Sequence, residues 1–130
     1  MTKTSHWIFV INDTDKEFKR RLDKRKWPIF HFTINRKRIR ADDLAIFYKA
    51  GAGGQKIIGK ATTASAIISI DGKLDFYVKL KDVEQCNDVS IRPLVKKLEF
   101  IKNKQQWGGY LQGGVRPITE KDYETIVSKF

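Results

Sequence analysis

Residues 100–114 hold the groups whose types and spacing are best suited to bind a flat anion. They combine Lys102, Lys104 and Trp107 with four glycines within fifteen residues. Lysine neutralises phosphate, an indole offers a face on which a base can stack, and glycine lets backbone amides approach a ligand closely. A buried segment would not be so polar, and a flexible linker would not contain Trp107. The pattern predicts a segment that binds nucleic acid.

The basic residues of the chain are concentrated in one region. The chain has 26 Lys and Arg against 15 Asp and Glu, a formal net charge of +11. Residues 16–40 contain 11 basic residues and two acids, so they carry 11 − 2 = +9, and the remainder carries 15 − 13 = +2. This imbalance predicts a polyanionic partner. The expected phosphate-binding residues are Arg36, Lys37, Arg38, Arg40, Lys102 and Lys104.

Length and composition predict one domain over residues 1–130, large enough for a hydrophobic core. The single Cys86 can form neither an internal disulfide nor a zinc site by itself, which suits a reducing cytoplasm. No signal peptide is recognisable, and no apolar run reaches the roughly 18 residues that a membrane span needs. We therefore expect a cytoplasmic protein, monomeric and not bound to a membrane.

Periodicity predicts the elements that position these groups. The apolar run at residues 7–11 predicts a central strand buried on both faces. Thr14 and Glu17 form a capping-box pattern, which predicts a basic helix from about residue 15 to residue 26, ended by Pro28. Residues 29–34 are rich in β-formers, and residues 35–43 form a basic loop.

The second half of the chain is predicted to consist mainly of strands. Gly59 indicates a bulge or a close backbone approach, and Asp71-Gly72 indicates a turn. Thr119 caps a final helix. The remaining expected elements are strands at 44–49, at 56–65 with a continuation over 67–70, and at 76–81, and helices at 91–98 and 120–129. This order predicts an α+β domain in which five to six strands form a curled sheet or small β-barrel flanked by helices.

Several motifs follow one another in a characteristic order along the chain. They are the opening strand 7–12, Trp27 after the first helix, the strand 43–48, Ile58-Gly59, residues 100–104 with Trp107, and the ending 116–123. This order resembles that of EVE domains, especially the small stand-alone archaeal proteins of that family. The resemblance covers almost the whole chain, and its last third is the most specific part.

EVE domains belong to the PUA-like superfamily and are similar to YTH domains, which hold a methylated adenine in an aromatic cage. The resemblance implies a PUA-like curled β-barrel with a pocket for a modified base of DNA or RNA, without catalysis or a cofactor. Trp27 matches a cage wall, and Asn12 matches an asparagine that binds the base. Residues 62–65 lack the second cage tryptophan of YTH domains, so Trp107, Phe30 or Phe47 is expected to complete the base-binding pocket.

Each of these residues also has a purely structural explanation. Trp27 would serve equally to pack the helix end on the sheet, Trp107 to hold its loop in place, and Asn12 to form a turn. Trp7, within an apolar strand, is expected in the core. For the whole protein, the alternatives are a PUA-like RNA-binding module without modified-base selectivity and an enzyme that acts on nucleic acid.

The sequence offers no convincing catalytic or metal-binding set for an enzyme. Adjacent carboxylates such as Asp42 and Asp43 point to opposite faces of a strand, so a turn explains them better than a nuclease centre. His6 and His31 have no Cys or carboxylate partner at metal-ligand spacing. The glycines of residues 51–54 are not followed by the Gly-Lys-Ser/Thr of a P-loop.

Overall fold

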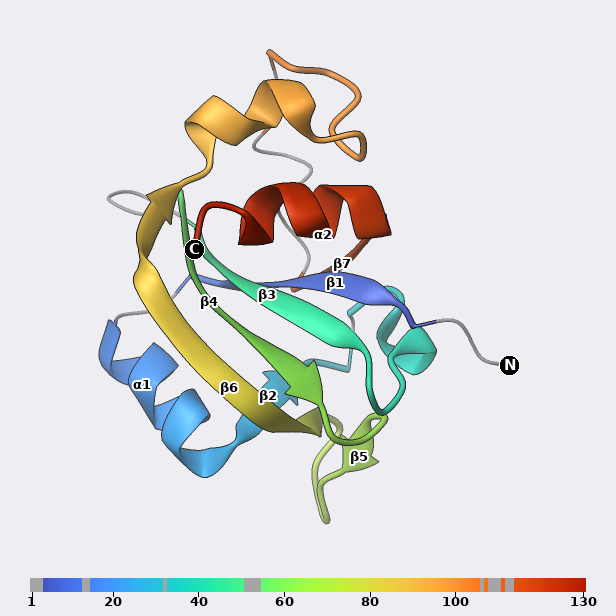
Figure 1. Cartoon of the computed structure of the whole chain (residues 1–130). Coiled ribbons are helices and arrows are strands. Elements are labelled where there is room, and N and C mark those ends of the chain that lie inside the picture. The colour runs from blue at the N-terminus through green and yellow to red at the C-terminus, as the bar shows by residue number, and fades with distance from the viewer. Residues whose placement is uncertain are drawn as a thin grey trace.

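Six strands follow one another across a curled mixed sheet in the computed structural model, in the order β2-β6-β4-β3-β1-β7 (Figure 1). The structure describes residues 4–12, 15–31, 33–50, 55–105, 107, 111 and 114–130. The strands are β1 (His6–Ile11), β2 (Lys26–Ile29), β3 (Leu44–Lys49), β4 (Lys56–Thr63), β6 (Phe76–Ser90) and β7 (Val115–Ile118), with the short β5 (Ile68–Ser69) paired to β6 beside this path. The helices are α1 (Asp15–Lys24) and α2 (Glu120–Val127), with 3₁₀ helices η1 (Arg36–Arg38) and η2 (Arg92–Lys97).

This architecture confirms the expected α+β class and the curled sheet flanked by helices. Strand β1 lies inside the sheet, parallel to β3 and antiparallel to β7. The long strand β6 pairs with β4, and its first residues also pair with β2 and β5. Within the described ranges, neither helix has the length and apolar composition needed to cross a bilayer.

Strand β1 is buried on both faces, as its sequence predicts, and its alternate residues enter two separate cores. Trp7, Phe9 and Ile11 enter one core, whereas Ile8 enters the other. We call the first the aromatic core, because it contains Trp7, Phe9, Phe18, Trp27 and Phe47; α1 packs on it. We call the second the aliphatic core, formed by Ile8, Ile46, Tyr48, Ile57, Ile91, Leu94, Val95, Leu98, Ile101, Leu111 and Ile126 and covered by η2 and α2.

The end of α1 differs from the sequence prediction. The helix ends at Lys24, because Arg25 takes a left-handed conformation (φ 55°) and turns the chain into β2. Pro28 does not end the helix; it lies within β2. Strand β2 is an edge strand that pairs only with β6 along the sheet, so the missing N–H of proline is tolerated there.

Three other predicted elements are corrected. The strand expected at residues 29–34 is wrong, since β2 ends at Ile29 and a turn leads to η1. Residues 67–70 do not continue β4; within them, Ile68–Ser69 form the separate strand β5, which pairs with β6. The helix expected at residues 91–98 is the 3₁₀ helix η2, which still buries Leu94 and Val95 as its spacing predicts.

Gly59 confirms the expected close backbone approach. The register between β3 and β4 shifts near Gly59, as does that between β4 and β6. A Cβ atom at this position would lie 2.8 Å from the backbone oxygen of Glu84 and 3.4 Å from the ring of Phe47. The glycine therefore allows the sheet to curl tightly over Phe47.

Candidate nucleic-acid interface

Trp27 and Phe47 form the closest pair of aromatic rings among the residues that the structure describes. Their ring centroids lie 4.6 Å apart with an interplanar angle of 10°, a parallel stack. Phe18 of α1 meets both rings edge-on, at 6.2 Å from Trp27 and 5.5 Å from Phe47. Trp27 is 1% exposed and Phe47 is 0% exposed. These two predicted pocket residues are therefore together, but closed within the aromatic core.

Arg21 lies over the indole of Trp27. The Cζ atom of its guanidinium is 4.7 Å from the ring centroid, within cation–π range. Its side chain is 14% exposed, and its Nε atom lies 3.7 Å from Oε1 of Glu17. Trp27 is thus covered by a flat cation that is itself close to solvent. From the sequence, we treated Arg21 only as one of many basic residues. Its position one helical turn after Phe18 could have predicted its contact with the aromatic core.

Asn12 and Phe30 are the exposed members of the predicted pocket. Asn12 directly follows β1 and is exposed, and Phe30 directly follows β2 with 44% of its surface exposed. The neighbouring His31 is tied to Asp75 through its backbone N–H and its Nδ1, both 2.9 Å from Oδ1. These hydrogen bonds lower the pKa of the Asp75 carboxyl. They hold the segment after Phe30 against the start of β6.

Trp107 packs against the aliphatic core rather than the aromatic core. It is half-buried, and the Arg92 guanidinium lies over its ring at 5.9 Å from the centroid. The five predicted side chains therefore do not form one open cage in this structure. Trp27 and Phe47 come together, while Trp107 packs on the other core. The part of each residue in base binding stays a prediction.

Two of the predicted phosphate-binding arginines contact aromatic rings. Arg36 lies 5.8 Å from the Phe76 centroid and donates from Nη1 to the Thr33 carbonyl at 2.9 Å. Arg38 lies 6.0 Å from the Trp7 centroid and donates from Nη1 to Oδ1 of Asn35 at 3.3 Å. Together with Arg21, they place three guanidinium groups over rings that belong to the aromatic core or pack against it. The rings and the positive charge of this region are therefore adjacent.

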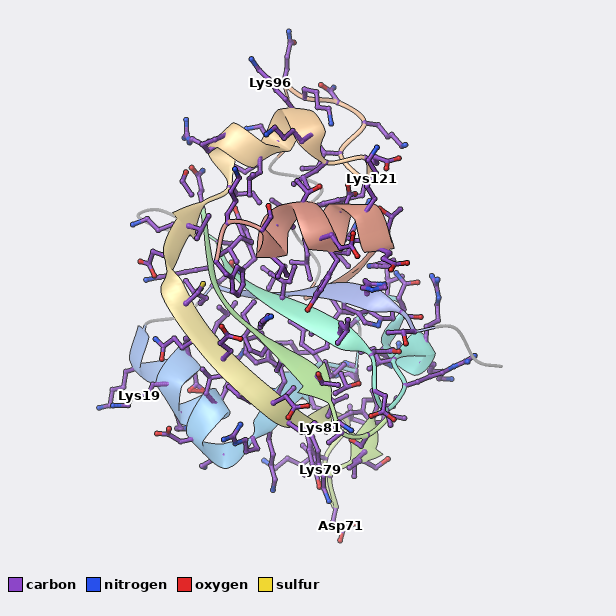
Figure 2. All side chains as sticks on the ribbon, viewed as in Figure 1. Lys19, Asp71, Lys79, Lys81, Lys96 and Lys121 are labelled. Atoms are coloured by element: carbon purple, nitrogen blue, oxygen red, sulfur yellow. The ribbon has the colours of Figure 1, made fainter. Side chains whose placement is uncertain are left out.

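The remaining predicted cations project from the surface. Lys37, Arg40 and Lys102 are exposed, whereas Lys104 donates from Nζ to the Leu98 carbonyl at 2.6 Å. Helix α1 adds exposed charge on its outer side, where Lys19 points away from the sheet (Figure 2). Of the six predicted residues, Lys37, Arg40 and Lys102 are the best placed to meet a phosphate.

A buried carboxylate fixes the basic loop against β1. Asp43 is 2% exposed and accepts from Nε1 of Trp7 at 2.9 Å, from the Arg40 N–H at 2.9 Å and from the Ser5 N–H at 3.2 Å. Asp42, in a left-handed turn, pairs instead with Lys81. The Asp42-Asp43 pair is thus a strand-entry turn, as its sequence predicts. The described residues also bring no group of three His, Cys, Asp or Glu together as metal ligands.

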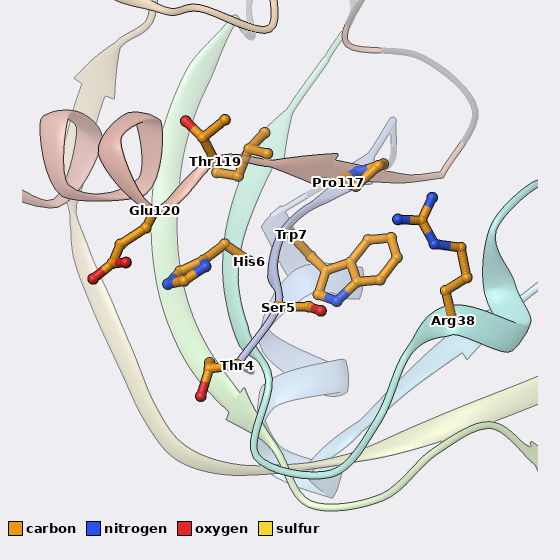
Figure 3. Close-up of a pocket in the computed structure, with 9 residues that line it drawn as sticks. Thr4, Ser5, His6, Trp7, Arg38, Pro117, Thr119 and Glu120 are labelled. Carbon is orange, nitrogen blue, oxygen red and sulfur yellow. The ribbon is translucent and has the colours of Figure 1, made fainter. Parts of the chain in front are cut away.

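A shallow hollow of about 250 Å³ lies at the opposite end of β1 from Asn12 (Figure 3). Thr4, His6, Trp7, Arg38 and Thr119 line it, among other residues. At roughly 3.3 Å per strand residue, His6 and Asn12 are about 20 Å apart. Trp7 is 1% exposed there and offers no open face for stacking. Arg38 lines the hollow, and the hollow is separate from the predicted base-binding residues.

The curled sheet has a PUA-like fold, and this fold defines the structural class of the protein. It matches the ASCH protein of Zymomonas mobilis with a TM-score of 0.60 at 10% identity, over 95% of this chain and 94% of the other. It matches the YTH domain of the Zygosaccharomyces rouxii MRB1 protein, solved in complex with N6-methyladenosine RNA, with a TM-score of 0.68 at 12% identity, over 97% and 86% of the two chains. These likenesses show the fold.

Within that class, the chain belongs to the EVE domain family, whose model matches residues 5–129. A UPF0310 protein of Pyrococcus abyssi is 30% identical to it over an alignment of 143 positions, which covers 95% of this chain and 98% of the relative. The match along almost the whole chain confirms the resemblance that the motifs predicted.

Proposed function

We propose that this protein is a non-catalytic nucleic-acid-binding module that reads a modified base over Trp27. The observation that carries the proposal is the Trp27–Phe47 stack, over which Arg21 of the basic region 16–40 lies. The likeness in fold to a YTH domain crystallised with N6-methyladenosine RNA supports it. In this proposal, one nucleotide is flipped out, or taken from a single strand, and its base stacks on the indole.

The energetics assign a large share of the affinity to the phosphates. Unstacking a base costs a few kcal/mol, and stacking on an aromatic side chain returns about 1–3 kcal/mol. Contacts with phosphate must supply the remainder. Lys37, Arg40 and Lys102 are exposed and suited to this role, with Arg36, Arg38 and Lys104 beside them. Affinity should therefore fall steeply with salt.

Selectivity for the modification requires a polar contact as well. A buried methyl group contributes only about 0.8 kcal/mol by area. Asn12 is exposed at the end of β1, and its amide can donate to and accept from one base edge. A base whose edge does not match leaves these groups unpaired, which costs more than the methyl group contributes.

One structural observation favours a second candidate, an RNA-binding module without modified-base selectivity. Trp27 and Phe47 are almost completely buried, as expected for core residues. In that case, the basic surface alone binds RNA and the aromatic stack only stabilises the fold. The two candidates differ in whether the affinity depends on the modification.

Equilibrium titration of matched oligonucleotides separates these functions. We expect tighter binding to single strands that carry one N6-methyladenosine or another methylated base than to unmodified strands, in RNA or in DNA. Asn12→Ala should lower this preference by about 1–3 kcal/mol and leave salt-sensitive binding intact. Gln85→Ala, which removes another exposed amide on β6, is the matched control.

Equal affinity for all modified and unmodified strands would leave only the second candidate. Asn12→Asp, which removes the donor and adds a negative charge, should reduce the preference more than Asn12→Ala. Conversion of the bound strands in the presence of divalent metal would show an enzyme and overturn both candidates.

A further inference from the structure

Arg21 occupies the most restricted position of all the basic residues on α1. Its guanidinium Cζ atom lies 4.7 Å from the Trp27 centroid, the shortest cation–ring distance within the described residues. The preceding residue, Arg20, is 66% exposed at its side chain, against 14% for Arg21. Two adjacent arginines of the same helix therefore differ sharply in what they contact.

Phe18 meets Trp27 edge-on and Phe9 is tilted against it, whereas two other groups lie over its ring. Phe47 stacks on the indole at 4.6 Å, and Arg21 lies over it at 4.7 Å. The Phe47 ring and the Arg21 guanidinium cannot occupy the same space above the indole, so each covers a different part of it. Phe47 is completely buried within β3, whereas Arg21 is on a helix and partly exposed. Of the two, only Arg21 can leave without opening the core.

The guanidinium also has the shape of the ligand proposed for this site. It is planar, delocalised and of the thickness of a nucleobase, and it stacks on aromatic faces as a base does. From these observations, and on the basis of the proposed function, we propose that Arg21 is a self-ligand. It fills the stacking position over Trp27 in the free protein, and an incoming base must displace it.

Arg21 shares its Glu17 contact with Arg20, which lowers the cost of this displacement. Glu17 lies 3.7 Å from Arg21, but it also lies 3.7 Å from Nε of Arg20. When Arg21 leaves, the Glu17 carboxylate keeps its contact with Arg20. The released guanidinium moves into solvent on the basic side of α1. Arg21 thus makes binding more selective among bases, because only a base that stacks on Trp27 better than the guanidinium does can displace it.

The test compares Arg21→Ala with Arg20→Ala. Both variants remove one positive charge and one Glu17 contact, but only the first uncovers Trp27. The probe is free N6-methyladenosine with a panel of other methylated nucleosides, which carry no phosphate. Binding is measured by calorimetry.

Arg21→Ala should bind the preferred nucleoside about two- to thirtyfold more tightly than the wild type, the range that loss of a competing cation–π contact allows. Arg20→Ala should match the wild type.

Arg21→Gln provides the same comparison with less loss of packing, if the alanine variant folds poorly. If Arg21→Ala and Arg21→Gln bind the nucleoside as the wild type does, or more weakly, Arg21 is only a structural cover and the inference is overturned. The wild-type preference for modified oligonucleotides would then still support the proposed function. If neither the wild type nor any variant distinguishes modified from unmodified bases, the proposed function fails, and the self-ligand role with it.

Discussion

The two cores on opposite faces of the sheet differ in what covers them. The aliphatic core lies under η2 and α2 and is built mainly from Ile, Leu and Val. The aromatic core lies under α1, and Arg21 and Arg38 lie over its tryptophan rings. Alternate residues of the same strand, β1, enter both cores. On the aliphatic side, arginines lie over Trp107 and Phe100, which are half-buried and pack against that core. On the aromatic side, they lie over tryptophans that are themselves buried core residues, which is the arrangement on which the proposed function rests.

The largest expected effect compares a tryptophan of each core. Trp27→Ala should cost about 3–5 kcal/mol of unfolding free energy, because the side chain is 1% exposed and stacked on Phe47. Trp107→Ala should cost less, because Trp107 is half-buried. Urea unfolding of both variants measures the difference. A smaller loss for Trp27→Ala than for Trp107→Ala would contradict the closed aromatic core.

A substitution in the aliphatic core should change stability without changing binding selectivity. Ile46 follows Ala45 and precedes Phe47 on β3, but its side chain lies in the aliphatic core. Ile46→Ala should cost about 2–5 kcal/mol of unfolding free energy. The ratio of affinities for modified and unmodified strands, measured well below the melting temperature, should stay at its wild-type value. A changed ratio would show that the two faces are coupled.

The two buried aspartates allow a closer comparison of the faces. Asp43 accepts from Trp7 and Arg40 beside the aromatic core, and Asp122 accepts from the Glu99 and Phe100 N–H groups at 2.8 and 3.0 Å beside the aliphatic core. Asp43→Asn and Asp122→Asn should each cost about 1–3 kcal/mol of stability, because an amide nitrogen cannot accept these bonds. Only Asp43→Asn should also alter the salt dependence of nucleic-acid binding, since Asp43 holds the basic loop.

Single cations of the basic loop should differ in their electrostatic contribution. Lys37→Ala should reduce the slope of log affinity against log salt by about 0.7–0.9, the value for one phosphate contact. Arg36→Ala should change the slope less and lower the melting temperature more, because Arg36 donates to Thr33 and contacts Phe76. Titrations at several salt concentrations measure both slopes. An unchanged slope in Lys37→Ala would move the phosphate-binding surface elsewhere.

The smallest expected effect is a pH dependence confined to the aliphatic core. Burial raises the pKa of the Tyr48 phenol to about 12, although the positive charge of Arg92 opposes the shift. A raised folded-state pKa means that the folded protein retains the proton longer than the unfolded chain. The resulting stability is present below the ordinary phenol pKa and is lost as pH rises toward 12. Absorbance titration against Tyr48→Phe should show this late phenolate; titration near the ordinary value would contradict the burial.

Local patterns predicted the elements whose residues determine their own structure. The apolar run at residues 7–11 predicted β1, and residues 76–81 were predicted as the strand that begins β6, both without knowledge of their pairing partners. Thr119 caps α2 as expected, with its Oγ accepting from the Asp122 N–H at 3.0 Å. Gly59 marked a close approach, because only a residue without a Cβ fits there.

The errors lie where distant residues decide the structure. Residues 26–38 depend on the pairing of β2 with β6 and on the left-handed turn at Arg25. For the site, the sequence left open whether Trp27 is a pocket wall or packs the helix end on the sheet. Only the distant residues Phe47, Phe18 and Arg21, which enclose it, show how it packs, and its part in base binding stays a prediction. The glycine-rich part of the 100–114 segment and residues 51–54 lie outside the described residues, so the predictions made for them stay predictions.

The central claim, that a modified base stacks on Trp27, is tested most directly by the indole N–H signals of the three tryptophans in a ¹⁵N–¹H NMR spectrum. Trp7→Phe, Trp27→Phe and Trp107→Phe assign the signals. On addition of a methylated oligonucleotide, the Trp27 signal should shift strongly, and the unmethylated strand should shift it less. The Trp7 signal, held by Asp43, should stay in place. Binding with an unmoved Trp27 signal would contradict the account.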